Sequence, residues 1–586
     1  MNCFKVRKSF VRTLKFHYTH TRFISEIQQK IKNSYYAMYG DVLLSGSRIG
    51  QLLDETADKY GDKTAFISMH QDISKNYSEF RNEADRLASG FISLGLRRGD
   101  RIGICSPNCY EWPLTQFAAA KAGLILVNLN PAFQSNELAF CLNKASCKAL
   151  VISDAFKTQD YYKMLLQIAP DLSENKSEKI QSNNLPHLER VIIMSDKKKN
   201  GILNFKDVLN NGNKESATIL AETEKLIQFD DPVNIQFTSG TTGEPKGAVL
   251  THHNLVNNAL LGGRRFGYNM MKYIVCCQLP LFHSFGCVHI SLTTVFYQGT
   301  CVFPCAGFDA VSSLQAVEKY RCSIIFGTPT MYVDLLNNYK SGEYNISSLN
   351  RGILGGAAAP PALVEDIRKI LRIPNLQVGY GATETSPAVA CNKLIDNFEN
   401  VTKGILQPLE YVETKVINDK GHVVPINAQG ELCVRGHVVF RGYWQEKNPS
   451  KQAPDKLRWY HTGDLAVMNE YGYIRIVGRI KDMIIRGGEN IYPLEVESYI
   501  STHPAVLEIH ICGVPDERMG EEACAWIHVK KGMSLNEEEV KEFCKGKISH
   551  FKIPRYIMFV EDFPKTHSGK IKKFEMSKIS AEKLNL

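Results

Sequence analysis

Strand-like and helix-like segments alternate along the chain between residues 76 and 153, and this alternation constrains the fold most strongly. The stretch 76–96 places its apolar side chains on one face of a helix, at the period of about 3.6 residues. Beyond it, strands are expected at 101–105, 124–129 and 148–153, with helices at 110–123 and 136–145 between them. Such a strand–helix–strand rhythm implies a mainly parallel sheet covered by helices. The N-terminal part is therefore expected to be a large α/β body with several subdomains.

A second, smaller unit follows the stretch "GRIKD" at residues 478–482. Helices are expected at 492–500 and 536–548, and strands at 505–514 and 524–531. This pattern predicts a compact α+β domain. The expected division is thus a body at 39–480 and a C-terminal domain at 481–586.

The first residues have the composition of a mitochondrial transit peptide. Residues 1–40 carry eight Lys or Arg and one acid, and Val6, Phe10 and Leu14 fall on one helical face. We expect a transit peptide at 1–38, a mature start between residues 25 and 45, and a location in the mitochondrial matrix. The alternative is a frayed basic terminus. The chain ends in "EKLNL", which is not the Ser-Lys-Leu peroxisomal signal.

The charge distribution argues against a nucleic-acid partner. Of the net charge of +9, residues 1–40 contribute +7 and residues 541–586 contribute +6, which leaves −4 for the middle. A nucleic-acid-binding protein more often shows a basic stripe across its body. The basic C-terminal segment is instead compatible with small polyanionic substrates.

A transmembrane segment and a zinc site are also not expected. Residues 273–308 lack charged side chains, but Pro280, Gly286 and Gly299 interrupt them, so a buried helix followed by a strand is expected. The sixteen cysteines show no zinc-ligand spacing. In a reducing compartment they are expected to be small buried apolar residues.

The stretch "TSGTTGEPKG", residues 238–247, has the composition of an anion-binding loop. It is not a nucleotide-binding loop of the G-x-x-x-x-G-K-[ST] type, because Pro245 precedes Lys246 and no Ser or Thr follows it. Strands are expected on both sides, and Thr251 is expected to cap a helix that begins at His252. Such a loop binds an anion through its backbone amides, hydroxyls and lysine, and a mobile surface hairpin is the alternative.

Four further motifs follow in order: "GYGATETSP" (379–387), "WYHTGDL" (459–465), "GRIKDMIIRGGENIYPLEVE" (478–497) and "PKTHSGKIKK" (564–573). With these motifs, residues 45–580 resemble the adenylate-forming superfamily of acyl-CoA synthetases, aryl-CoA ligases, luciferases and peptide-synthetase adenylation domains. Within it, the chain is most similar to mitochondrial medium-chain acyl-CoA synthetases. The resemblance implies a fatty acid–CoA ligase that uses ATP, Mg²⁺ and CoA, with acyl-AMP as intermediate and pyrophosphate as product.

The same resemblance assigns an ATP site. The loop would hold the β- and γ-phosphates through Thr238, Ser239, Gly240, Thr241, Thr242, Gly243, Glu244, Pro245 and Lys246. Thr383 would contact the α-phosphate, Glu384 would bind Mg²⁺, and Tyr380 would pack beside the adenine. Asp464, supported by Arg479, would accept hydrogen bonds from the ribose hydroxyls. Lys570 would reach the reacting carboxylate and the α-phosphate. The residues expected to be catalytic are Lys570, Glu384 and His283.

Acyl and CoA sites are implied in the same way. His283 would stand at the mouth of the acyl pocket, whose depth would depend on Phe285, Val288, Gly355 and Ala382. The small domain would be mobile and rotate about Lys481 between the two half-reactions. The residues lining the pantetheine path would be Gly487 and Gly488.

Two other functions remain open at this point. The acyl acceptor could be a separate carrier protein rather than CoA, because only sixteen residues follow Lys570 and no carrier domain is fused there. A catalytically silent acyl or nucleotide sensor is the other. The presence of Lys246, Glu384, Asp464 and Lys570 argues against a sensor.

Overall fold

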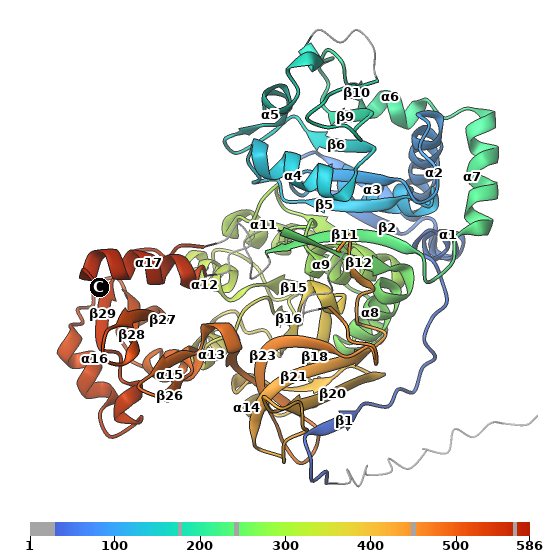
Figure 1. The fold of residues 1–586 in the computed structure, drawn as a ribbon. Coiled ribbons are helices and arrows are strands. Elements are labelled where there is room, and N and C mark those ends of the chain that lie inside the picture. Colours follow the sequence, from blue (N-terminus) through green and yellow to red (C-terminus); the bar gives the residue numbers. More distant parts are fainter. Residues whose placement is uncertain (1–29, 174–178, 240–244, 447–452, 566–570) are drawn as a thin grey trace, which may run out of the picture.

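The computed structural model describes residues 30–173, 179–239, 245–446, 453–565 and 571–586 (Figure 1). The body contains two large sheets, one of eight and one of fourteen strands, and the C-terminal part has its own sheet of five. In Figure 1 the C-terminal part, in red, lies beside the body near α12 and α13. A separate hairpin contains β7 (Ala155–Phe156) and β8 (Gln159–Asp160).

The eight-stranded sheet confirms the expected strand–helix alternation. Its strands are parallel from β10 to β11, and only β12 and β22 are antiparallel to their neighbours. In spatial order they are β10 (Leu203–Asn204), β9 (Arg190–Met194), β6 (Ala149–Ser153), β4 (Arg101–Cys105), β5 (Ile125–Leu129), β11 (Pro232–Ser239), β12 (Pro245–Thr251) and β22 (Gly442–Tyr443).

Helices cover both faces of this sheet. On β4, Ile102 and Ile104 pack into the apolar core that contains α2 and α3, whereas Cys105 packs into the core that contains α4 and α5. The helix α2 begins where expected, because Asn76 forms a capping box with Glu79: it accepts from the Glu79 N–H at 2.8 Å and donates its own N–H to the carboxylate at 2.9 Å. The helices are α2 (Tyr77–Ser93), α3 (Glu111–Lys121), α4 (Ser135–Ala145), α5 (Tyr161–Ile168), α6 (Phe205–Asn210) and α7 (Lys214–Leu226).

The fourteen-stranded sheet is mixed, and this differs from the mainly parallel sheet expected. It is parallel from β17 to β2, but antiparallel from β17 to β1 and at the β2–β3 edge. Short connections allow antiparallel pairing, whereas parallel pairs need a crossover. The order is β1 (Tyr35–Ala37), β20 (Val412–Ile417), β21 (Gln429–Gly436), β23 (Tyr460–Met468), β24 (Ile474–Arg479), β19 (Ile405–Pro408), β18 (Ala388–Cys391), β17 (Asn375–Gly381), β16 (Arg351–Leu354), β15 (Ile324–Gly327), β13 (Ile274–Cys276), β14 (Thr300–Phe303), β2 (Thr64–Ser68) and β3 (Ile73–Asn76).

The uncharged stretch 273–308 forms a buried strand, helix and strand. The helix and the second strand were expected, and the first strand, β13, was not. The helical part contains α9 (Ser284–Gly286), the π-helix η3 (Cys287–Leu292) and α10 (Thr293–Phe296). In the described part of the chain, no helix has the length and apolarity needed to cross a membrane. The other helices of the body are α1 (Ile49–Tyr60), α8 (His252–Arg265), α11 (Ala310–Tyr320), α12 (Pro329–Asn338), α13 (Pro361–Ile370) and α14 (Phe398–Thr402).

The C-terminal part has the expected α+β composition and its own apolar core. The expected elements correspond to α15 (Pro493–Ile500), β27 (Val506–Asp516), β28 (Gly520–Val529) and α16 (Glu537–Cys544). The structure adds β25 (Ile484–Arg486), β26 (Glu489–Ile491), β29 (Tyr556–Phe559) and α17 (Lys573–Leu584). The 3-10 turn η5 (Ile480–Asp482) connects this part to β24 of the body.

The described chain joins the body before residue 38. Strand β1 pairs antiparallel with β20, and the buried Ser34 donates a hydrogen bond to the Pro425 carbonyl at 2.9 Å. Residues 1–29 of the expected transit peptide lie outside the described residues. The segment 33–37 is therefore part of the folded body.

Candidate active site

Asp464 is held by two donors at the edge of the cleft between the body and the C-terminal part. It lies on β23, is 5% exposed, and faces Arg479 of β24 directly across the antiparallel ladder. The Arg479 Nε lies 3.0 Å from Asp464 Oδ1, and the Tyr380 hydroxyl donates to Oδ2 at 2.6 Å. Burial and the Asp464 carboxylate raise the pKa of Tyr380, so its hydroxyl keeps its proton. This arrangement fixes the orientation of a buried carboxylate.

The backbone around Asp464 is braced by its neighbours. The Asp464 N–H donates to the Thr462 hydroxyl at 3.0 Å, and that hydroxyl donates to the Leu432 carbonyl at 2.8 Å. The Gly463 N–H donates to Glu431 at 3.2 Å. Gly463 has φ +70°, a conformation that favours glycine.

Glu384 forms the second polar centre. It lies in the 3-10 turn η4 (Thr383–Thr385) and is 8% exposed. Its Oε1 accepts hydrogen bonds from the Thr238 hydroxyl at 3.1 Å and from the Tyr443 hydroxyl at 2.9 Å. The Lys246 ammonium lies 5.4 Å from the centre of the Tyr443 ring. The ends of β11 and β12 and the strand β22 therefore meet at this carboxylate.

The stretch expected to bind an anion has a strand on each side, as the sequence predicts. Thr238 faces Lys246 and Ser239 faces Pro245 in the β11–β12 ladder. Thr251 caps α8 by accepting the Asn254 N–H at 3.2 Å, which confirms that expectation. The residues Gly240, Thr241, Thr242, Gly243 and Glu244 lie outside the described residues.

A cleft of about 3120 Å³ separates the body from the C-terminal part. The body contributes Tyr380, Asp464, Arg479 and residues 356–360. The other wall contains Lys481 of η5 and Ile571, the neighbour of Lys570, which itself lies outside the described residues. The cleft can therefore accept a ligand that contacts both parts of the chain.

Gly487 and Gly488 do not belong to the described lining of this cleft. They form the β25–β26 turn, with φ of +56° and +88°. The Gly487 N–H donates to the Met519 carbonyl at 2.7 Å, and a Cβ on Gly487 would lie 2.4 Å from the Met519 Cε. Only glycine fits this position without a shift of Met519.

Three of the residues expected to form an acyl pocket lie in or next to α9 and η3. A Cβ on Gly355 would lie 3.0 Å from the Phe285 ring, which itself packs edge-on against His289 and Phe326. Val288 is fully buried in η3. His283 occupies the N-cap position of α9 without a capping hydrogen bond from its side chain, and its ring centre lies 4.3 Å from that of Phe282. Ala382 precedes η4.

Comparison with known proteins decides the family. The AMP-binding enzyme family matches residues 53–444, and the AMP-binding enzyme C-terminal domain matches residues 495–570. The chain belongs to the AMP-binding enzyme family. This confirms the resemblance to adenylate-forming enzymes and the α/β class of the fold.

Curated relatives cover nearly the whole chain. The mitochondrial medium-chain acyl-CoA ligase ACSF2 of Danio rerio is 42% identical and covers 99% of this chain and 98% of its own. The ACSF2 protein of Homo sapiens is 42% identical over 93% of this chain and 89% of its own. The putative acyl-CoA synthetase YngI of Bacillus subtilis is 37% identical over 92% and 98%.

Solved structures of the same fold contain ATP or an acyl-adenylate. The anthranilate CoA ligase AuaEII, in complex with anthranoyl-AMP, has a TM-score of 0.81 and is 25% identical over 93% of this chain and 99% of its own. The ATP-bound MatB of Rhodopseudomonas palustris has a TM-score of 0.75 and is 25% identical over 92% and 100%.

Two residues of the site in this AMP-binding enzyme were not predicted from the sequence. Tyr443 is the second hydrogen-bond donor to Glu384, and Glu431 holds the Gly463 N–H beside Asp464. A tyrosine in "RGYW" and a glutamate in a strand carry no spacing signal of their own. Their partners lie 59 and 32 residues away in the sequence, so only the fold brings them together.

Proposed function

We propose that this AMP-binding enzyme is an ATP-dependent fatty acid–CoA ligase. It would join a carboxylic acid to AMP with release of pyrophosphate, and then transfer the acyl group to CoA. The observation that carries the proposal is the 42% identity to a named acyl-CoA ligase over 99% of the chain. The match includes both the body and the C-terminal part. It therefore covers the residues proposed for adenylation and those proposed for thioester formation.

The geometry supports an adenylation site. A carboxylate is a poor electrophile, and the mixed anhydride with AMP gives it a good leaving group. Asp464 would accept hydrogen bonds from the ribose hydroxyls, with Arg479 and Tyr380 fixing its orientation. Tyr380 would also pack beside the adenine, near the backbone of residues 355–360.

The phosphate end would lie at Glu384. Both of its hydrogen bonds from described side chains reach Oε1, which leaves Oε2 for a cation. Mg²⁺ prefers carboxylate and phosphate oxygens, so this buried carboxylate fits the ion. When bound, Mg²⁺ would neutralise charge on the triphosphate. Thr383 would contact the α-phosphate, and the loop Thr238–Lys246 would hold the β- and γ-phosphates.

The second half-reaction needs another arrangement of the same parts. We propose a body at 39–480 and a C-terminal domain at 481–586 that rotates about Lys481. The cleft wall next to residue 570 fits the adenylation arrangement, in which Lys570 would stabilise charge on the reacting carboxylate and α-phosphate. Gly487 and Gly488 lie outside the described cleft lining, and rotation would bring their turn to the pantetheine of CoA.

We further propose a preference for medium-chain fatty acids and a location in the mitochondrial matrix. The first rests on the relatives named medium-chain ligases and the second on those named mitochondrial. The acyl chain would enter past His283 and end near Ala382 and Gly355. The Phe285 ring lies against Gly355 and would close the end of the pocket.

A pyrophosphate-release assay over straight-chain acids of increasing length tests the proposal. Each buried methylene contributes about 0.8 kcal/mol, so kcat/KM should rise about fourfold per carbon until the pocket is full. Gly355→Val should shift the preferred acid to a shorter chain, because a Cβ there already meets Phe285 at 3.0 Å. Gly46→Val is the matched control, because a Cβ on Gly46 meets no atom within 4 Å.

The same assay separates the alternatives. A protein that releases no pyrophosphate with any acid would be a sensor rather than a ligase. One that releases pyrophosphate but forms no thioester when CoA is added would use another acceptor, such as a separate carrier protein. A preference for an aryl or very long-chain acid would contradict the medium-chain assignment.

A further inference from the structure

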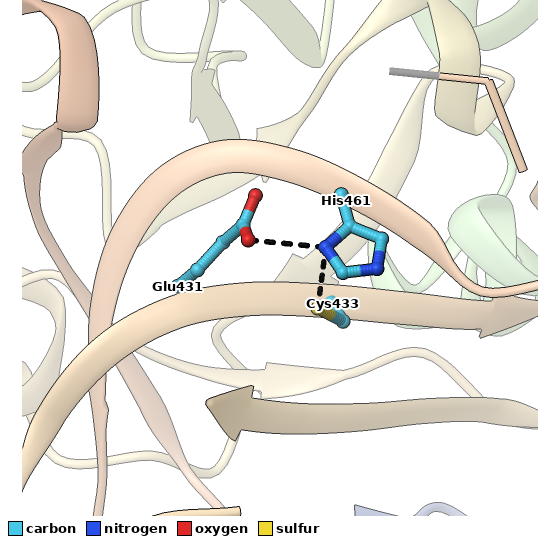
Figure 2. A group of neighbouring side chains, drawn as sticks. All are labelled: Glu431, Cys433 and His461. Atoms are coloured by element: carbon cyan, nitrogen blue, oxygen red, sulfur yellow. Dashed lines mark hydrogen bonds and ion pairs between the residues drawn. The ribbon is translucent and has the colours of Figure 1, made fainter. Parts of the chain in front are cut away.

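Three side chains of different chemistry converge on the neighbouring strands β21 and β23, the second of which also carries Asp464. Glu431 and Cys433 come from β21 and His461 comes from β23, and their ligand atoms all lie within 4.8 Å of one another (Figure 2). Among the described residues this is the one group of three or more His, Cys, Asp or Glu with such a spacing.

The three donors meet at one ring nitrogen. Figure 2 shows both Glu431 and Cys433 directed at the same side of the His461 ring. The Nδ1 of His461 lies 3.0 Å from Glu431 Oε2 and 3.6 Å from Cys433 Sγ. A tetrahedral Zn²⁺ site, with Zn–S near 2.3 Å and Zn–N or Zn–O near 2.0–2.1 Å, requires ligand separations of about 3.3–3.6 Å. The two distances to Nδ1 differ from these values by at most a few tenths of an ångström, and the Glu431–Cys433 separation is below 4.8 Å.

The strands hold this geometry in place. Residues two apart on a strand share a face, so Glu431 and Cys433 point the same way. Cys433 faces His461 directly in the β21–β23 ladder, and the register shifts between this pair and the next pair, Glu431 with Leu465. No loop movement is needed to assemble the three ligands.

The surroundings also suit a bound cation with an open position. Cys433 is buried, while the side chains of His461 and Glu431 are 32% and 22% exposed, which leaves an approach from solvent. Glu431 uses its other oxygen, Oε1, to accept the Gly463 N–H, so the carboxylate is oriented by a second contact. The charged groups that act on His461 are two carboxylates, Glu431 and Asp455, and one ammonium, Lys415.

We propose that Glu431, Cys433 and His461 form a Zn²⁺-binding site with three protein ligands and one open position for water. Thiolate and imidazole ligands favour Zn²⁺ and similar transition metals over Mg²⁺. The site is distinct from the cation site proposed at Glu384, and it does not depend on the ligase activity. A bound Zn²⁺ would link β21 to β23 three residues before Asp464.

Cobalt substitution tests this site through the cysteine itself. Chelator-treated, desalted full-length protein is titrated with Co²⁺, which gives a near-ultraviolet charge-transfer band only when a thiolate binds it. The wild type should show this band at one equivalent, and Zn²⁺ should remove it while Mg²⁺ leaves it unchanged. Cys433→Ser should abolish the band, and His461→Gln or Glu431→Gln should weaken binding at least tenfold.

Controls keep the test independent of folding and of the other cysteines. Cys305→Ser, which changes a half-buried cysteine outside the group, should retain the band. Zn²⁺ should raise the Tm of the wild type and of this control but not of Cys433→Ser. A wild type without a thiolate band overturns the proposal, whatever the variants do. A band that survives in Cys433→Ser, or that disappears in Cys305→Ser, overturns it as well.

Discussion

At the scale of single residues, Asp464 combines burial, charge and two donors. Asp464→Asn keeps the size of the side chain and removes its charge opposite Arg479. A hydrogen bond to a charged group contributes about 1.5–3 kcal/mol, so kcat/KM for ATP should fall about 10- to 100-fold. Pyrophosphate release, measured against ATP at a saturating acid concentration, checks this expectation.

The control for that variant is Tyr380→Phe, which keeps the ring and removes one donor to Asp464. The decrease in kcat/KM for ATP should be smaller for Tyr380→Phe than for Asp464→Asn. If Asp464→Asn raised the KM for the acid as much as the KM for ATP, the residue would not be specific to the nucleotide.

Three buried histidines make stability depend on pH. His252, His289 and His437 are 1%, 0% and 7% exposed, and burial lowers the pKa of each to about 3. They are neutral in the folded chain, whereas the unfolded chain takes up protons near pH 6.5. The folded state should therefore lose stability as pH falls below about 6.5, by about 1.4 kcal/mol per pH unit for each histidine.

Urea unfolding between pH 5 and 8 measures this slope. His289 packs between the rings of Phe266 and Phe285, so His289→Leu removes the titrating group from an apolar site. Whatever its effect on absolute stability, this variant should reduce the slope of the unfolding free energy against pH by about 1.4 kcal/mol per pH unit, which is the contribution of one proton. An unchanged slope would show that His289 does not titrate on unfolding.

The sequence motifs predicted the charged residues of the site, but not the neighbouring residues that hydrogen-bond to them. Asp464, Arg479 and Tyr380 stand in motifs and contact one another, while Glu384 forms a separate polar centre with Thr238 and Tyr443. Their roles in the reaction stay predictions. Tyr443 was missed, because its hydrogen bond to Glu384 exists only after β22 pairs with β12. The zinc-ligand group was missed for a similar reason, since its ligands come from two strands without a cysteine spacing.

At the scale of elements, local periodicity explains which parts were predictable. The parallel strands β4, β5 and β6 are nearly continuous apolar runs, and each is separated from the next by a helix. The first of these helices, α3, is buried along nearly its whole length, and the second, α4, is amphipathic. The antiparallel strands from β18 to β24 depend on pairing and on bulges that no local pattern specifies. Helix α17 was missed because only Met576 and Ser580 of its twelve residues are buried.

The 3-10 turn η5 is the element on which the proposed rotation depends. Proline fixes φ near −65°, a value that also suits a 3-10 helix, and it restricts the residue before it. Lys481→Pro should therefore hold the arrangement in which residue 571 faces the cleft. The variant should still release pyrophosphate and form acyl-adenylate, but transfer the acyl group to CoA very slowly.

Two further variants serve as comparisons for Lys481→Pro. Lys481→Ala leaves the backbone free and should be mild in both half-reactions. Lys570→Ala should show the opposite defect, with slow adenylation and normal thioester formation from ready-made acyl-adenylate. If a folded Lys481→Pro protein lost both half-reactions equally, or lost neither, Lys481 would not be the hinge.

At the scale of the whole molecule, the basic excess lies at the two ends of the chain. Residues 541–586, with a net charge of +6, contribute part of the C-terminal wall of the cleft. ATP and CoA are polyanions, so positive charge at this wall can attract both. The N-terminal excess lies mainly in residues 1–29, which fits a leader whose charge acts in transport and not in catalysis.

Truncation separates the leader from the fold. Residues 30–37 contact the body through an ion pair of Lys30 with Glu470 at 2.7 Å, the buried Ser34 and the strand β1. Deletion of residues 1–29 should leave Tm and pyrophosphate release unchanged and abolish import into isolated mitochondria. Deletion of residues 1–37 should also lower the Tm, because it removes β1 and exposes the edge of β20 to solvent.

The two deletions test different statements. If the protein without residues 1–29 still enters mitochondria, the leader assignment is wrong. If the longer deletion is as stable as the shorter one, β1 adds nothing to the fold, and cleavage could occur as late as residue 38. A loss of Tm confined to the longer deletion would place the processing site before Asn33, because Ser34 and β1 must stay with the mature enzyme.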